Sequence, residues 1–123
     1  MANVLNLAYK VYNELKEENC ITEDLRKRLD SAPSIVLSSG LFGLTLLALK
    51  NRSDKGWNSI IIVLSRFLKE KLNEDVDEQD ASKLIDKVYE ISRSERSVII
   101  TREFLEYIKW LKYLVRASVG EGQ

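Results

Sequence analysis

The side chains of this chain that could do chemistry are mainly its cations, because the usual catalytic residues are scarce. The 123-residue sequence contains no histidine and a single cysteine, Cys20. A Ser-His-Asp or Cys-His relay within one chain is therefore excluded, and a zinc site would need ligands from other chains. A disulfide within the chain is also impossible, which is typical of proteins in a reducing cytosol. We expect Cys20 to be a half-buried structural residue at the end of a first helix.

The carboxylates and glycines also lack the spacing of catalytic or ligand-binding motifs. Acidic residues gather between positions 70 and 90, but no partner is fixed beside them and no glycine completes a calcium loop. Gly40 and Gly43 lie in an apolar segment without the Lys-Ser/Thr pair of a phosphate loop. The sequence thus predicts a protein that is not an enzyme and uses no metal ion or cofactor.

Two groups of basic residues are the main candidates for a binding function. The first group recurs at helical spacing on one face, and its members are Arg102, Lys109, Lys112 and Arg116. The second is a consecutive run, Arg26, Lys27 and Arg28, with further cations near the next loop at Lys50, Arg52 and Lys55. Such faces could follow a phosphate backbone without reading its sequence. An ordinary solvated surface, neutralised by nearby glutamates, is the simpler alternative.

Three aromatic residues, Tyr107, Trp110 and Tyr113, are interleaved with the cations near the C-terminus. Aromatic rings beside cations suit stacking on single-stranded bases. These rings also border an apolar stripe, and packing in the core or against another subunit is therefore the favoured interpretation.

Hydrophobic periodicity predicts an all-α fold, a compact bundle of five to six helices without strands. Apolar positions at three- and four-residue spacing indicate a first helix over residues 4–15. A final helix carries a core stripe that consists of Ile100, Phe104, Ile108, Leu111 and Val115. We expect a single domain over residues 1–117, followed by a flexible C-terminal tail over 118–123.

Small polar residues predict where the helices begin. Thr22, Ser53 or Asp54, Asp80 and Ser94 are each placed to cap a helix N-terminus. The helix after Thr22 is expected to stop before Pro33, because proline disfavours a helical residue ahead of it.

The uncharged segment 31–49 barely reaches the length of a membrane span, and its proline, glycines and serines suit a lipid-facing helix poorly. We interpret residues 35–50 as a buried central helix, with Gly40 and Gly43 marking a kink or a close helix crossing. The N-terminus shows no basic region followed by an apolar core, so a cytoplasmic protein is expected.

Five short segments, taken in order, resemble one known family. They are Arg-Leu-Asp-Ser-Ala-Pro at 28–33, Ser-Gly-Leu at 39–41, Gly-Trp at 56–57, Thr-Arg-Glu at 101–103 and Lys-Trp-Leu-Lys at 109–112. Their order and spacing resemble the small all-helical subunit of type III-B CRISPR effector complexes, the Cmr complexes. The resemblance covers most of residues 1–117.

The resemblance implies a non-catalytic, cytoplasmic subunit in antiviral defence that stacks with copies of itself into a short filament. It would lie beside larger subunits that carry the crRNA, help hold target RNA against it through backbone contacts, and leave cleavage to another subunit. The small subunit of another CRISPR effector type and a helical adaptor that binds only protein are the alternatives. A HEPN-type ribonuclease is excluded, because its Arg-x4-His signature requires histidine.

Overall fold

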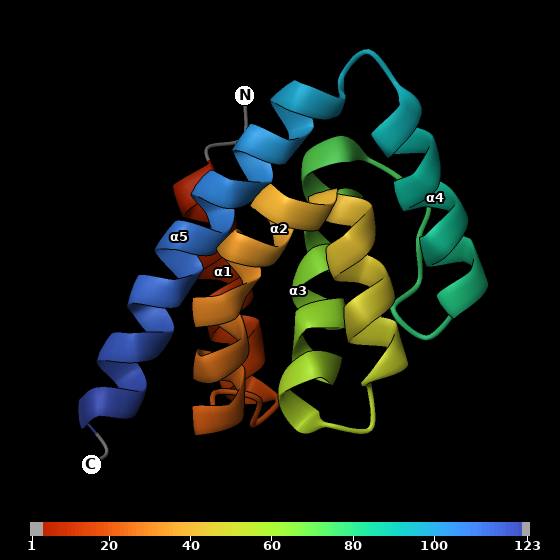
Figure 1. Cartoon of the computed structure of the whole chain (residues 1–123). Helices are drawn as coiled ribbons and strands as arrows, with labels where there is room; N and C mark the ends of the chain where they lie inside the picture. The colour runs from red at the N-terminus through yellow and green to blue at the C-terminus, as the bar shows by residue number, and fades with distance from the viewer. Residues whose placement is uncertain (1–3, 122–123) are drawn as a thin grey trace.

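The computed structural model describes residues 4–121 and consists of five α-helices around one core (Figure 1). The helices are α1 (Val4–Glu17), α2 (Glu23–Lys50), α3 (Lys55–Leu72), α4 (Ala81–Arg93) and α5 (Ser97–Glu121). No strand occurs among residues 4–121, and the predicted all-α fold is confirmed. α5 continues to Glu121, into the segment that was expected to form a tail, and residues 122–123 lie outside the described part.

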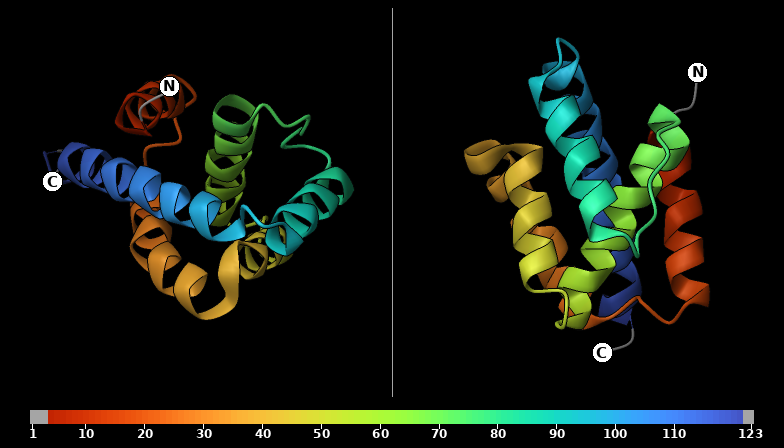
Figure 2. Two further views of the ribbon diagram at one scale, coloured as in Figure 1. Left: turned by 90° about the horizontal axis from the view of Figure 1, so that it is seen from above. Right: turned by 90° about the vertical axis from the view of Figure 1, so that its right-hand side faces the viewer.

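The five helices are arranged around α2, α3 and α5. α2 packs on both α3 and α5, α1 packs on α5 and α3, and α4 packs on α2 and α5. Figure 2 shows α1 and α4 on opposite sides of this central group. α1 and α4 therefore cover the core from two sides.

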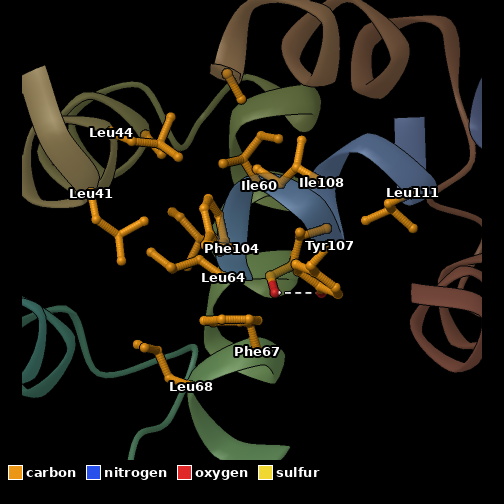
Figure 3. Packing of buried hydrophobic residues seen from close by; sticks show 14 of the residues in the cluster. Leu41, Leu44, Ile60, Leu64, Phe67, Leu68, Phe104, Tyr107, Ile108 and Leu111 are labelled. Atoms are coloured by element: carbon orange, nitrogen blue, oxygen red, sulfur yellow. Dashed lines mark hydrogen bonds between the residues drawn. The ribbon is translucent and has the colours of Figure 1, made fainter. Parts of the chain in front are cut away.

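Aromatic rings from α3 and α5 fill the middle of the core (Figure 3). The ring of Phe67 lies with its centroid 5.2 Å from those of Phe104 and Tyr107, which are 5.9 Å from each other. The Tyr107 hydroxyl donates a 2.8 Å hydrogen bond to the Val63 carbonyl oxygen. Burial raises the pKa of Tyr107 well above its ordinary value. The predicted α5 stripe is buried throughout, and Tyr107 extends it.

Three of the predicted helix caps are confirmed. The Thr22 side chain accepts a 3.1 Å hydrogen bond from the Leu25 amide. The side chains of Asp54 and Asp80 likewise accept from the amides three residues later in the sequence, Trp57 and Lys83. The prediction for Ser94 is wrong, because Ser94 is the C-cap of α4 and its hydroxyl donates to the Ile91 carbonyl. α5 begins only at Ser97, after a short turn.

The predicted end of a helix before Pro33 is also wrong, since α2 runs through this proline and bends later, at Gly40. Proline removes one backbone hydrogen bond, whereas continuing the helix keeps Leu29, Ala32 and Val36 buried. Gly40 has φ 75° and ψ 174°, a conformation that is nearly restricted to glycine. The kink expected near Gly40 is therefore confirmed.

A close helix crossing lies elsewhere, at Gly56 in the first turn of α3. A Cβ atom on Gly56 would lie 2.6 Å from the Asp24 carbonyl oxygen and 2.8 Å from Cγ of Arg28. Only glycine therefore lets the start of α3 pack this closely on the start of α2.

Residues 35–50 are not the buried central helix that was expected. Leu41, Leu44 and Ala48 are buried, but Leu37 is 76% exposed and Leu46 is 42% exposed. α3, α4 and α5 pack on one face of α2, and its opposite face is exposed (Figure 2). Among the described residues, α2 is the one helix that is long and apolar enough to cross a membrane by length and composition. Of the 18-residue apolar stretch of α2 that meets this test, 33% is buried inside the protein.

Candidate functional site

The two predicted basic groups meet at Asp30 in the first half of α2. Arg26 donates a 2.9 Å hydrogen bond to Asp30 Oδ2, and Nε of Arg116 on α5 lies 3.3 Å from Asp30 Oδ1. Oδ1 is buried and accepts no hydrogen bond from the described residues, so the contact with Arg116 is electrostatic only. Asp30 thus joins the start of α2 to the end of α5. Cations from distant parts of the sequence therefore lie on one surface.

Arg26 has a second acidic partner, Glu23, in the first turn of α2. The hydrogen bond from Arg26 lowers the pKa of the Glu23 carboxyl below its ordinary value. Arg26 therefore bridges two carboxylates, and its guanidinium is held in place on the helix surface. Lys27 beside it is exposed and forms no ion pair with a described residue.

The predicted face of α5 is present as a ridge of four cations, Arg102, Lys109, Lys112 and Arg116, which share one side of a continuous helix. Lys109 pairs with Glu106 at 2.9 Å, and its ammonium lies 4.9 Å from the centre of the Trp110 ring. Arg102 and Lys112 form no ion pair with a described residue, so part of the positive charge is not neutralised within the protein. We call Arg26, Lys27 and these four residues the α2–α5 basic surface.

The aromatic residues of α5 divide between the core and the surface. Tyr107 is completely buried, so the preference for packing over base stacking is confirmed for this ring. Trp110 is half-buried, and its ring contacts that of the exposed Tyr113 edge to face, with centroids 6.0 Å apart. Trp110 and Tyr113 are thus the aromatic rings of α5 that a ligand could reach.

Arg28, the third member of the basic run, is turned away from this surface. Its guanidinium donates to Asp54 at 3.2 Å and lies 5.1 Å from the centre of the Trp57 ring. This hydrogen bond, together with that from the Trp57 amide, lowers the pKa of Asp54. Arg28 therefore links the start of α2 to the start of α3, and helix periodicity could not separate it from its neighbours.

The acidic segment between α3 and α4 is neutralised by lysines and one arginine of the same chain. Asp75 pairs with Lys83 at 2.9 Å, and Glu74 pairs with Lys87 at 3.4 Å. The hydrogen bond from Lys83 lowers the pKa of Asp75. The acidic and basic stretches of the sequence thus do not become two opposed surfaces after folding.

Arg66 on α3 is the charged residue that sequence reasoning missed. Its partly buried guanidinium lies 3.0 Å from both Glu14 and Glu18 and 3.6 Å from Glu78. It thereby ties α1 and the acidic segment to α3. Burial lowers the pKa of Arg66, but its hydrogen bond to Glu18 and the negative charges of the three glutamates together raise that pKa above its ordinary value. No local spacing signals this role, because the three partners come from distant parts of the chain.

These features define a small helical bundle with one basic surface. No group of three or more His, Cys, Asp or Glu side chains that could hold a metal ion occurs among residues 4–119. The model of the CRISPR-associated protein family Cas_Cmr5 matches residues 2–118, and the chain belongs to this family. The relationship indicated by the order of sequence motifs is thus confirmed, and the protein is a subunit of a Cmr complex. Comparisons with curated proteins and with solved structures gave no match.

Proposed function

We propose that this protein is the non-catalytic small subunit of a type III-B effector complex and holds crRNA and target RNA through the α2–α5 basic surface. The observation that carries the proposal is the joining of Arg26 and Arg116 at Asp30, which extends the cation ridge of α5 onto α2. Such a ridge suits backbone phosphates, whose recognition is electrostatic and independent of sequence. Base pairing between guide and target then supplies the sequence specificity.

Stacking of copies into a short filament is the second part of the proposal. Large apolar side chains remain exposed toward the end of the bundle where α2 bends and α5 begins (Figure 1). Leu37 is 76% exposed, and Val98 and Ile99 in the first turn of α5 are also exposed. Apolar side chains grouped at one end favour contact with another protein surface, here a second copy.

Cleavage of RNA belongs to another subunit in this proposal. General acid-base cutting of RNA needs positioned titratable groups, and the sequence offers no histidine for that task. The protein would act in the cytoplasm, as part of the antiviral complex.

The test is a triple substitution on α5, Lys109→Ala, Lys112→Ala and Arg116→Ala, measured by fluorescence anisotropy of labelled RNA on the reconstituted complex. RNA affinity should fall, and the slope of log affinity against log salt should decrease by about one for each phosphate that is no longer bound. The helical content and the melting temperature of the variant should change little, because exposed ion pairs contribute little to stability. A matched control with the same charge change combines Lys16→Ala, Lys69→Ala and Arg93→Ala, which lie outside the surface.

Two other results would redirect the proposal. Assembly that weakens without RNA would show that acidic protein surfaces are the partner, as expected for an adaptor. Unchanged affinity and unchanged salt slope would remove Lys109, Lys112 and Arg116 from the site and leave Arg26, Lys27 and Arg102 as the remaining cations of the surface.

A further inference from the structure

A pocket of about 390 Å³ opens at the end of the bundle opposite the exposed apolar residues of α2 and α5. It lies between the loop joining α1 to α2 and the loop joining α2 to α3, which Figure 1 shows at the same end of the molecule. Its lining includes two cations, hydroxyls and side-chain amides, and the residues that carry the argument are Asn19, Thr22, Arg52, Lys55, Asn58 and Ser59. None of the lining residues is acidic.

The positive charge in this pocket has no partner among the described residues. Neither Arg52 nor Lys55 forms an ion pair with any residue of the described range 4–119. The nearest carboxylate in sequence, Asp54, is engaged by Arg28 and by the Trp57 amide. The pocket therefore presents two free cations beside neutral hydrogen-bond donors, which is an environment suited to an anion.

Ser59 provides an independent sign that a ligand belongs here. Its side chain lines the pocket and is only 5% exposed, yet its hydroxyl makes no hydrogen bond with a described residue. Buried hydroxyls in helices usually donate to the carbonyl four residues earlier, as Thr45 does to Leu41 at 2.8 Å. Ser59 is thus a largely buried side chain whose unpaired hydroxyl is available to an occupant of the pocket.

We propose that this pocket binds a phosphate group. Arginine and lysine recognise phosphate oxygens through charge-assisted hydrogen bonds, and serine, threonine and asparagine side chains can complete the set of donors. The phosphate comes either from an RNA backbone or from a terminal phosphate. The site shares no residue with the α2–α5 basic surface, so either proposal can fail without the other.

The test uses the full-length protein labelled with ¹⁵N and titrated with inorganic phosphate, with chloride used to hold ionic strength constant. The amide signals of Lys55, Asn58 and Ser59 should shift in a saturable manner, while those of α4 stay in place. Combined Arg52→Ala and Lys55→Ala substitutions should weaken binding at least about tenfold, from the loss of two charged donors. Lys69→Ala, at the other end of α3, is the matched control and should bind as the unsubstituted protein does.

Ser59→Ala separates a ligand-binding role from a structural one. The hydroxyl has no partner in the described protein, so its removal should leave the melting temperature unchanged or raised while phosphate affinity falls about threefold. A lowered melting temperature with unchanged phosphate affinity would contradict the role given to Ser59.

A short RNA with or without a 5′-phosphate then identifies the source of the group. Shifts of the same signals with both RNAs assign the pocket to backbone phosphates, and shifts only with the phosphorylated RNA assign it to a terminal phosphate. The proposal is overturned if inorganic phosphate and both RNAs leave these signals unmoved. It is also overturned if the variant with both Arg52→Ala and Lys55→Ala binds phosphate as tightly as the Lys69→Ala variant does.

Discussion

α5 and α4 are consecutive helices with very different attachments to the protein. α5 buries a full apolar stripe against α1 and α2, and its rings interlock with Phe67 of α3. α4 buries only Leu84, Val88 and Ile91 and reaches the rest of the bundle mainly through α2. On its other side α4 is tied to the acidic segment by ion pairs of exposed or partly exposed lysines.

The difference shows that helical periodicity alone does not set how firmly a helix is held. Both helices are amphipathic, but burial of large side chains contributes far more than exposed ion pairs. We therefore expect α5 to share the stability of the whole protein and α4 to open locally before it unfolds. Mutation, hydrogen exchange and pH titration can each test this contrast.

The largest effect is expected for Leu111→Ala on α5. Leu111 is completely buried, and truncation leaves a cavity that should lower the free energy of unfolding by about 2 to 5 kcal/mol. Chemical denaturation measures this change. Tyr113→Ala on the exposed side of the same helix is the control and should stay within about 0.5 kcal/mol. If Leu111→Ala lowers the free energy of unfolding by well below 1 kcal/mol, α5 is peripheral, and the contrast between α5 and α4 does not hold.

A smaller effect is expected in native-state hydrogen exchange. The central amides of α4 should exchange at least about tenfold faster than those of α5, which corresponds to about 1.4 kcal/mol less protection. The measurement is made by NMR under conditions where exchange reports the opening equilibrium. Equal protection of α4 and α5 would mean that the bundle opens as one unit, and α4 would then be as firmly held as α5.

The smallest effect is expected for Lys83→Ala, which removes the partner of Asp75. The pKa of Asp75 is lowered in the folded protein, so the pair contributes stability above the ordinary carboxyl pKa of about 3.9. That contribution disappears as the pH falls through the lowered pKa. NMR titration should show the Asp75 pKa rising toward its ordinary value in Lys83→Ala, with little change in melting at neutral pH. An unmoved Asp75 pKa would indicate that another cation holds this carboxylate.

Most of the fold could be predicted from sequence because its determinants are local. The stripe of α5 and the caps at Thr22, Asp54 and Asp80 depend on residues a few positions apart. The path of α2 could not be predicted in the same way. The preference of proline for ending a helix was outweighed at Pro33 by burial of the neighbouring apolar residues. The exposure of Leu37 depends on which helices pack beside α2. The close crossing at the start of α3 likewise involves a residue of another helix.

The candidate site could be predicted in composition but not in arrangement. Spacing identified the cations of α5, yet their connection to α2 depends on Asp30, which has no distinguishing sequence context. The sequence also could not show that Arg28 packs on Trp57 while Arg26 pairs with Asp30, the partner of Arg116. The unpaired hydroxyl of Ser59 is a property of the folded pocket and has no sequence signal.

The ring cluster has a consequence for synthesis of the protein on the ribosome. Phe67 lies in α3, but the rings that cover it, Phe104 and Tyr107, belong to α5 and are made only after α4. Until α5 leaves the ribosome, the apolar face of α3 stays open to water and to other nascent chains. A ribosome-bound chain ending before Phe104 should therefore recruit chaperones that recognise apolar surface, and release from them should coincide with the emergence of α5. For this bundle, the last helix decides when folding can finish.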